Sequence, residues 1–307
     1  MRHLLRRLFV DPEPPRVAVE VRPRAIGVVR VSQDGGRRGL AAAASMDLAE
    51  GALRLSAIES NVADEAALRA TLRSACERAG VPGGTPVALV LPDPVARITL
   101  LPASEVRARG EAEAQDLIRF RLKKTLPFDA REARVALRRE GESVLVVAAA
   151  PAVLDPYENA CLACGLTPGI VELAGLALLD AVRASRPPGD RLVVAWDHGY
   201  ASLLLTVAGA PALARTLTGP AAESPDELLR EIQSTLIYYA ERLGGAGLQG
   251  VTLRAAGPRP DAQPWLAGAL GLPVEAVDVW GHGDAREARL PAQELAGAAA
   301  SLLRRVA

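Results

Sequence analysis

Short apolar runs early in the chain predict paired strands. Mostly apolar residues occupy 17–21 and 25–31, and the turn signal at Pro23 between them predicts a β-hairpin. Residues 64–79 then follow a helical spacing and end before a glycine. The apolar run 86–90, bounded by glycine and proline, predicts a buried strand. This part of the chain therefore predicts an α/β unit that begins with a hairpin.

The same pattern starts again after a cluster of proline and glycine at 185–190. Apolar runs at 192–196, 202–207 and 212–217 predict three strands. Ser224 followed by Pro, Asp and Glu is a capping box, which predicts the start of a helix. Because both parts place hairpin-forming strands before helices, the sequence predicts an internal duplication and a two-lobed α/β fold.

A segment of different character separates the two halves. A strand at 97–101, a charged helix at 104–124 and strands at 133–138 and 143–149 predict a compact α+β module inserted in the first half. The predicted units are a first half (1–92), the inserted module (93–170), a helix and linker (171–188), a second half (189–289) and a C-terminal helix that returns to the first half (290–307).

Charge and composition narrow the function classes. Basic and acidic residues number 36 each, the net charge is zero, and aromatic residues make up 3% of the 307-residue chain. The sequence thus offers neither a long-range field nor stacking surfaces for nucleic acid. Cys161 and Cys164 form a CxxC pair, but no second pair completes the four ligands of a zinc site. Three cysteines without a secretion signal predict the cytoplasm, and we expect no metal and no membrane-spanning helix.

The first nine residues have two interpretations. As a helix they place Leu4, Leu5 and Leu8 beside Arg6 and Arg7, a basic amphipathic pattern that could hold the protein on an anionic membrane surface. Alternatively, they form a frayed terminus packed by a few leucines. We favour the frayed terminus and keep peripheral attachment to the inner membrane as the alternative.

Three stretches carry a family resemblance. The most specific is the middle one, where a strand and a charged helix precede Lys124-Thr-Leu-Pro-Phe-Asp129. In the second half, Glu231-Ile-Gln-Ser-Thr-Leu-Ile-Tyr-Tyr239 follows a third strand that contains Arg215. In this order, and over nearly the whole chain, these stretches resemble PilM, the actin-like protein of type IV pilus assembly. The resemblance implies an actin-like, two-lobed fold with ribonuclease-H-like duplicated halves and an inserted α+β subdomain.

The first nucleotide-binding turn departs from that family. Where the family pattern resembles Asp-Ile-Gly-Ser-Ser-Ser-x-Lys, this chain has Glu20-Val-Arg22-Pro23-Arg24-Ala-Ile-Gly27. Proline removes a backbone donor, and two arginines fill the space that glycine and serine leave open. Glu20 could lie near a nucleotide-bound metal, but we favour a carboxylate that pairs with Arg22 or Arg24. These two arginines could also bind phosphate through their side chains.

The other two nucleotide loops are also altered. The second turn contains Asp197, His198 and Gly199; one register loses the metal-side carboxylate, whereas a shift by two keeps Asp197 and Gly199 as a phosphate contact. The adenosine loop has Gly257 followed by proline instead of a glycine pair. A hydrolase would need a nucleophile elbow, which the sequence around Ser202 lacks. We expect no catalytic residue and no cofactor, and we keep ATP binding with magnesium as the disfavoured alternative.

A partner site follows from the resemblance. In PilM-like proteins, the cleft between the first half and the inserted module takes the short cytoplasmic tail of a PilN-like membrane protein as an extended peptide. The groove implied here consists of Leu101, Leu122, Leu126, Pro127 and Phe128.

Two functions compete. We expect a cytoplasmic scaffold of a type IV pilus or related secretion platform that binds a PilN-like tail and can self-associate. The alternative is an ATP-binding actin-like switch or weak ATPase of the same machinery. The cytoplasmic domain of GspL-like secretion proteins shares the fold but continues into a membrane helix, which is not expected in this sequence.

Overall fold

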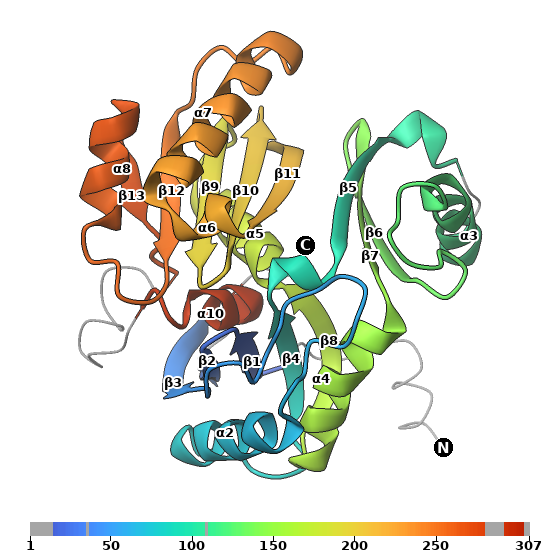
Figure 1. Cartoon of the computed structure of the whole chain (residues 1–307), viewed down its shortest axis with the longest axis vertical. Coiled ribbons are helices and arrows are strands. Elements are labelled where there is room, and N and C mark those ends of the chain that lie inside the picture. The colour runs from blue at the N-terminus through green and yellow to red at the C-terminus, as the bar shows by residue number, and fades with distance from the viewer. Residues whose placement is uncertain (1–14, 35–36, 108–109, 280–291, 304–307) are drawn as a thin grey trace.

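A computed structural model describes residues 15–34, 37–107, 110–279 and 292–303. The predicted basic helix of the first nine residues lies outside this part of the chain. Figure 1 shows two α/β lobes, one above the other, and a smaller unit beside the upper lobe. Within the described ranges, no helix combines the length and the apolar character needed to cross a membrane.

The first lobe is a five-stranded sheet in the order β3-β2-β1-β4-β8. Its strands are β1 (Val17–Arg22), β2 (Ala25–Asp34), β3 (Arg37–Asp47), β4 (Pro86–Leu91) and β8 (Thr167–Leu173). β1 is buried along its whole length because it lies at the centre of the sheet. Helices α2 (Glu65–Arg78) and α4 (Pro151–Ala163) cover one face, where Leu68 and Leu72 meet Val17 and Val19 in the core.

The second lobe repeats this topology, in the order β11-β10-β9-β12-β13. Its strands are β9 (Arg191–Asp197), β10 (Tyr200–Val207), β11 (Ala210–Thr218), β12 (Gly250–Ala255) and β13 (Val274–Ala276). Its helices are α6 (Pro220–Glu223), α7 (Pro225–Arg242) and α8 (Ala262–Leu270). Ser224 caps α7 as predicted, since its side chain accepts from the backbone N–H of Glu227. The identical strand orders confirm the predicted duplication.

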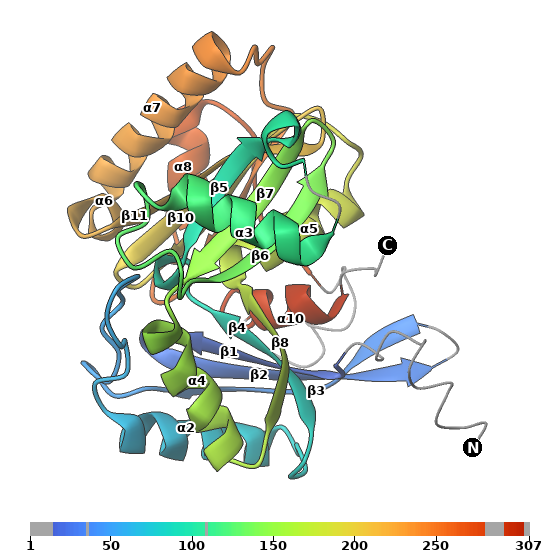
Figure 2. The same ribbon diagram turned by 90° about the vertical axis from the view of Figure 1, so that its right-hand side faces the viewer.

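The inserted module is a three-stranded sheet in the order β5-β7-β6. Its elements are β5 (Arg97–Pro102), α3 (Glu111–Leu122), β6 (Arg134–Glu140) and β7 (Ser143–Ala149). Figure 2 shows α3 lying across one face of this sheet. The predicted helix at 104–124 is too long, because a 3-10 turn occupies Ala103–Glu105 and α3 begins only at Glu111.

The predicted module boundary at residue 170 is corrected by the sheet pairing. β8 pairs with β4 in parallel and completes the first-lobe sheet, and α4 packs in the first-lobe core through Val153 and Tyr157. The sequence placed both elements in the module because they follow it directly. The inserted sheet and its helix therefore span Arg97–Ala149.

Two helices cross between the lobes. α5 (Ala174–Ser185) follows the last strand of the first lobe but packs on β9 and β10 of the second. α10 (Ala296–Leu303) follows the second lobe but packs on β1, β2 and β4 of the first. The two helices also pack against each other. Because of this exchange, apolar side chains of α5 and α10 form a layer between the lobes. The β1–β2 hairpin of the first lobe and the β9–β10 hairpin of the second lobe both pack against this layer.

Candidate functional site

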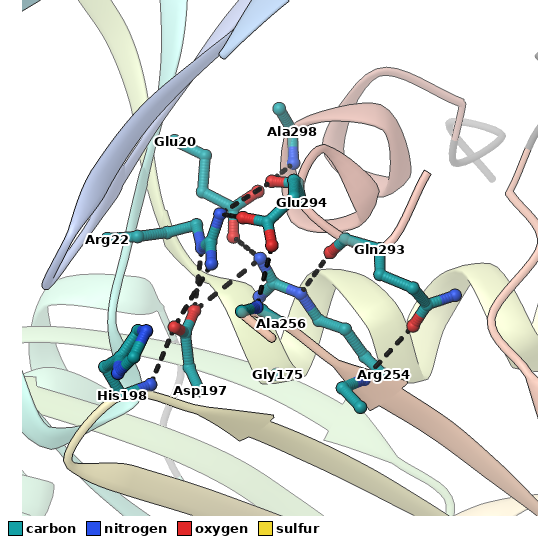
Figure 3. A network of polar contacts seen from close by, with 12 residues as sticks. Glu20, Arg22, Gly175, Asp197, His198, Arg254, Ala256, Gln293, Glu294 and Ala298 are labelled. Atoms are coloured by element: carbon teal, nitrogen blue, oxygen red, sulfur yellow. Dashed lines mark hydrogen bonds and ion pairs between the residues drawn. The ribbon is translucent and has the colours of Figure 1, made fainter. Parts of the chain in front are cut away.

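The two lobe hairpins meet at a direct ion pair. Arg22 is the last residue of β1 and Asp197 is the last residue of β9, so the duplication makes these positions equivalent. Arg22 Nε donates to Asp197 Oδ2 at 2.8 Å, and both side chains are at most 2% exposed. The turn after Asp197 contains Gly199 at φ +72°, a left-handed conformation that glycine adopts without strain. The ends of β1 and β9 therefore contact each other directly across the lobes (Figure 3).

A second ion pair lies beside the first. Arg254 of β12 approaches Glu20 of β1 at 2.6 Å, and both side chains are fully buried. Glu20 Oε2 also accepts from the backbone N–H of Ala298 at 2.9 Å, and Arg254 Nε donates to the carbonyl of Gln293 at 3.0 Å. Arg254 lies 3.8 Å from Asp197 Oδ2, so the two ion pairs form one group.

Glu294, which precedes α10, closes this group. Its carboxylate pairs with Arg22 Nη1 and accepts from the backbone N–H of Gly257 at 2.7 Å. The five residues, three acidic and two basic, are called the inter-lobe ion cluster: Glu20, Arg22, Asp197, Arg254 and Glu294. They come from three strands and the segment before α10, and both lobes contribute to the group. The Glu294 carboxylate thus joins Arg22 of the first hairpin (Figure 3) to the backbone of Gly257.

Within the cluster, neighbouring charges favour the ionised forms of Asp197 and Arg254. Burial alone would raise the pKa of Asp197, but Arg22 and Arg254 outweigh burial and lower it. Burial alone would lower the pKa of Arg254, yet Glu20 and Asp197 raise it above its ordinary value. A buried ion group of this kind contributes little net stability as a whole, but loss of one partner leaves an uncompensated buried charge.

The predicted pairing of Glu20 is wrong. Glu20 faces Arg254 rather than Arg22 or Arg24, because alternation along β1 puts Glu20 and Arg22 on the α10 face, where β12 of the second lobe reaches them. Arg24 lies on the turn and pairs with exposed Glu50 at 2.6 Å. The two arginines therefore do not act together: one guanidinium is enclosed by carboxylates and the other lies at the surface.

Asp93 is a buried carboxylate that sequence analysis missed. It follows β4, and its Oδ1 accepts from the backbone N–H of Gly175 at the start of α5, at 2.9 Å. Burial raises its pKa to about 6, although Ser202, Gly175 and Arg254 act in the opposite direction. No motif marks this residue, since the Asp-Pro pair in which it lies is also typical of ordinary turns.

Two glycines let the crossing helices approach these carboxylates. A Cβ added at Gly175 would lie 2.3 Å from Asp93 Oδ2, and one at Gly297 would lie 2.5 Å from Glu20 Oε1. Both positions require the absence of a side chain rather than an unusual backbone conformation, because neither has a positive φ. The helices α5 and α10 therefore hold the lobes together through contacts that the amphipathic pattern could not reveal.

A hollow of about 420 Å³ lies at the predicted adenosine loop. Gly257, Pro258 and Arg259 line one side, and Gln293 and Glu294 line another. The guanidinium of Arg259 lies 4.4 Å from the ring centre of Trp196, which holds this loop on the second lobe. Space for a base-sized group therefore exists beside the cluster, and Glu294, which lines this hollow, binds Arg22 of the first hairpin.

Cys161 of the CxxC pair is buried in the first-lobe core, and partly buried Cys164 packs against that core. Burial raises the pKa of Cys161 to about 12, which disfavours the reactive thiolate. Among the residues that the structure describes, no group of three or more His, Cys, Asp or Glu could hold a metal ion.

A separate groove of about 460 Å³ lies between the module and the first lobe. Val147 and exposed Ala136 line it from the module, while Ile170 and Leu176 line it from β8 and α5. β6 is the last strand of the module sheet and β8 is the last strand of the first-lobe sheet. Two sheet edges therefore border one apolar groove.

Ion pairs fix the rim of this groove. Arg134 of β6 pairs with Asp155 at 2.6 Å and with Glu158 at 2.8 Å, both on α4. Arg138, four residues further along the strand, pairs with Asp180 of α5 at 2.5 Å. The charges are satisfied at the rim, so the apolar side chains of the groove determine what it can bind.

The five residues predicted for the groove do not gather there. Leu122 and Leu126 are buried in the module core, Leu101 packs against that core, and Phe128 lies between the module core and the first-lobe core. Pro127 is exposed. The prediction is corrected because these side chains point to the face of the module sheet that carries α3, whereas the groove lies on the opposite face.

Comparisons with known proteins agree with this architecture. No family model and no curated protein matches the sequence. A solved PilM–PilN type IV pilus biogenesis complex matches with a TM-score of 0.74 at 20% identity, over 95% of this chain and 99% of that chain. The cytoplasmic domain of Vibrio cholerae EpsL, an inner-membrane component of the type II secretion system, matches with a TM-score of 0.48 at 12% identity, over 79% of this chain and 82% of that chain.

A Bacteroides thetaiotaomicron protein with an actin-like ATPase fold matches with a TM-score of 0.49 at 11% identity, over 88% of this chain and 93% of that chain. The duplicated sheets and the likeness to the PilM–PilN structure confirm the predicted fold: the chain is a two-lobed, actin-like α/β protein with an inserted α+β module. The resemblance to PilM is thereby confirmed at the level of the fold.

Proposed function

We propose that the protein is a scaffold of a type IV pilus or related secretion platform, and that it binds the N-terminal tail of a PilN-like membrane protein. The groove between β6 and β8 carries this proposal. Its place between module and first lobe is the place that the PilM resemblance implies for such a tail. The proposal puts the protein in the cytoplasm, at the inner membrane, and assigns it no catalytic residue, metal or cofactor.

The groove suits an extended peptide. An edge strand offers backbone N–H and C=O groups to an added strand, and the apolar pockets beside it select side chains on alternate positions. Both β6 and β8 offer such an edge, and Val147, Ile170 and Leu176 supply apolar contacts between them. An extended tail with apolar side chains at alternate positions would match these contacts.

The inter-lobe ion cluster supports a function without nucleotide. Arg22 and Asp197 stand at the two turns that hold phosphates in a working actin-like site, and each is already neutralised by a residue of the opposite lobe or by Glu294. A triphosphate would have to break these buried ion pairs before it could bind. The hollow beside Gly257 is the observation that keeps an ATP-binding switch as the second candidate.

The groove is tested with a synthetic peptide of the N-terminal tail of a PilN-like protein from the same organism, titrated calorimetrically. Ala136 is exposed and lies on the groove face of β6, so Ala136→Trp fills the groove without removing a core contact. We expect this variant to weaken binding at least about tenfold, equivalent to about 1.4 kcal/mol.

Ala112→Trp is the matched control, because Ala112 is an exposed alanine on α3, outside the groove. It should bind the peptide as the wild type does. A peptide that binds wild type and Ala136→Trp equally, or binds none of the three proteins, would contradict the proposed groove.

A further inference from the structure

A second, larger groove lies on the other face of the module. It has a volume of about 810 Å³ and is formed by β5, the Ala103–Glu105 turn and the C-terminal end of α3. Alternation along β5 directs Arg97, Thr99 and Leu101 to this face, which carries α3. The groove between β6 and β8 lies on the opposite face, so the two grooves are separate sites.

The second groove concentrates positive charge in a chain whose net charge is zero. Arg97, Arg121, Lys123 and Lys124 line it, and Glu105 is the only acidic residue among its lining residues. Lys123 and Lys124 are also the only lysines of the 307-residue sequence. The lining residues therefore carry a local charge of +3, four cations against one carboxylate.

Most of this charge is not used within the described parts of the molecule. Arg121 pairs with Glu105 at 2.8 Å. Arg97, Lys123 and Lys124 form no ion pair with any residue that the structure describes. Arg131, a residue outside the groove, is the main cause of the lowered pKa of nearby Asp129 and binds its carboxylate at 2.6 Å, while Lys123 adds a smaller effect.

An aromatic side chain projects at the same place. Phe120 lines the groove and is 77% exposed, the largest exposure among the large hydrophobic residues described. Burying a phenylalanine side chain against a partner contributes about 1.5–3 kcal/mol. Leu101 and Leu122 form the apolar floor below it. Cations and an apolar contact are thus presented together in a concave surface.

We propose that this groove docks an acidic amphipathic segment of a partner protein. Carboxylates of the segment meet Arg97, Lys123 and Lys124, and an apolar residue of the segment covers Phe120. A flat bilayer would reach the rim but leave the hollow and its leucine floor unfilled, and three cations without an ion pair are few for a nucleic acid, which typically engages about 6–10 phosphates. The inference goes beyond the proposed function, because it assigns a second partner site to the opposite face.

The probe for this site is a fluorescein-labelled helical peptide of about four turns, with leucines on one face and glutamates elsewhere. Fluorescence anisotropy with the full chain should report saturable binding that weakens as salt is raised from about 50 to 300 mM. A peptide with glutamine in place of each glutamate should bind at least about tenfold more weakly. Lys123→Glu/Lys124→Glu should weaken the acidic peptide at least about tenfold, and Phe120→Ser about threefold or more.

Arg73→Glu/Arg78→Glu is the matched charge reversal, since both residues are exposed on α2 of the first lobe. It should leave binding unchanged, as should Ala136→Trp in the other groove, so failure here is distinct from failure of the proposed function. Thermal unfolding confirms that each variant is folded. Equal binding by wild type and Lys123→Glu/Lys124→Glu, no binding at all, or binding of anionic vesicles without binding of the acidic peptide would overturn the proposal.

Discussion

The inter-lobe ion cluster and the second groove of the module, here called the basic groove, differ in how their charges are paired. In the cluster, Arg22 and Arg254 are enclosed and each guanidinium meets carboxylates of the same chain. In the basic groove, Lys123 and Lys124 face outward beside an exposed phenylalanine. Desolvated charges hold a single arrangement of the two lobes, because any separation would leave them unpaired. Exposed charges cost little and remain available to a partner.

The first hairpin contains this contrast within three residues. Arg22 and Arg24 flank Pro23, yet Arg22 is 2% exposed and paired across the lobes, whereas Arg24 is 38% exposed and paired with Glu50 at the surface. Arginine therefore joins the two lobes at position 22 and is a solvated surface side chain at position 24. Burial, rather than the identity of the residue, decides its effect.

Loss of the buried arginine should produce the largest effect. Arg22→Met keeps the length of the side chain but removes its charge, which leaves Asp197 and Glu294 near each other with Arg254 as the remaining cation. We expect the free energy of unfolding, measured by urea denaturation, to fall by about 3–5 kcal/mol. Arg24→Met is the matched control on the same turn and should leave the unfolding free energy unchanged within error.

The double variant Arg22→Met/Asp197→Leu sharpens this test. It removes both charges of the inter-lobe pair, so it should recover a large part of the stability lost in Arg22→Met. Equal destabilisation by Arg22→Met and Arg24→Met would show that the inter-lobe pair does not hold the lobes together.

A pH-dependent effect of intermediate size is expected from Asp93. Its pKa is about 6 in the folded protein and 3.8 in the reference state, so the folded chain binds a proton between these values and the unfolded chain does not. The contribution of Asp93 to stability is therefore full below pH 4 and is lost as pH rises through 6, by about 3 kcal/mol. Ser202 and Arg254 face this carboxylate and favour its charged form, whereas Glu20 opposes it.

Asp93→Asn removes this titration. The difference in unfolding free energy between wild type and variant, measured from pH 4 to pH 7, should shift in favour of the variant as pH rises. Asp190→Asn is a control with a carboxylate whose Oδ2 accepts from Tyr239 outside the inter-lobe region. A constant difference between wild type and Asp93→Asn across this range would show that Asp93 is ionised throughout.

Local sequence signals predicted most of the fold. The hairpin around Pro23, the helix capped by Ser224 and the repeated order of elements all appear as expected, because each depends on neighbours in the sequence. The assignment of β8 failed for the opposite reason. Its partner β4 lies before the inserted module, and nothing local in Thr167–Leu173 marks that distant pairing.

The candidate sites were predicted less completely than the fold. The altered loops drew attention to Glu20, Arg22 and Asp197, but the pairing of Glu20 with Arg254 joins two lobes and is not visible in either segment alone. Glu294 and Gly297 lie in the segment that begins α10, where an alanine-rich pattern predicts only packing. The groove residues were misplaced because a motif gives positions along the chain, whereas the face of a sheet depends on strand register.

The smallest expected effect is the change in Tm when nucleotide is added. A Tm that ATP leaves unchanged would separate the closed ion cluster from the open grooves of the module most directly. ATP with magnesium would have to open the ion pairs of Arg22, whereas a peptide reaches either module groove without breaking any buried contact. A ligand present at a hundred times its Kd stabilises the folded state by about 2.7 kcal/mol. In a protein of this size, such a gain raises the Tm by about 4 °C.

We therefore expect ATP and magnesium, at about 1 mM each, to change the Tm by less than about 1 °C in a thermal melt. Arg22→Met/Glu294→Ala tests the physical reason, because it removes the ion pair that joins the hollow beside Gly257 to the first hairpin. If this variant gains a magnesium-dependent shift that the wild type lacks, the ion cluster is the barrier to nucleotide. A large shift in the wild type would instead mean that the lobes open readily, and the buried charges would then stabilise a closed state that ATP can displace.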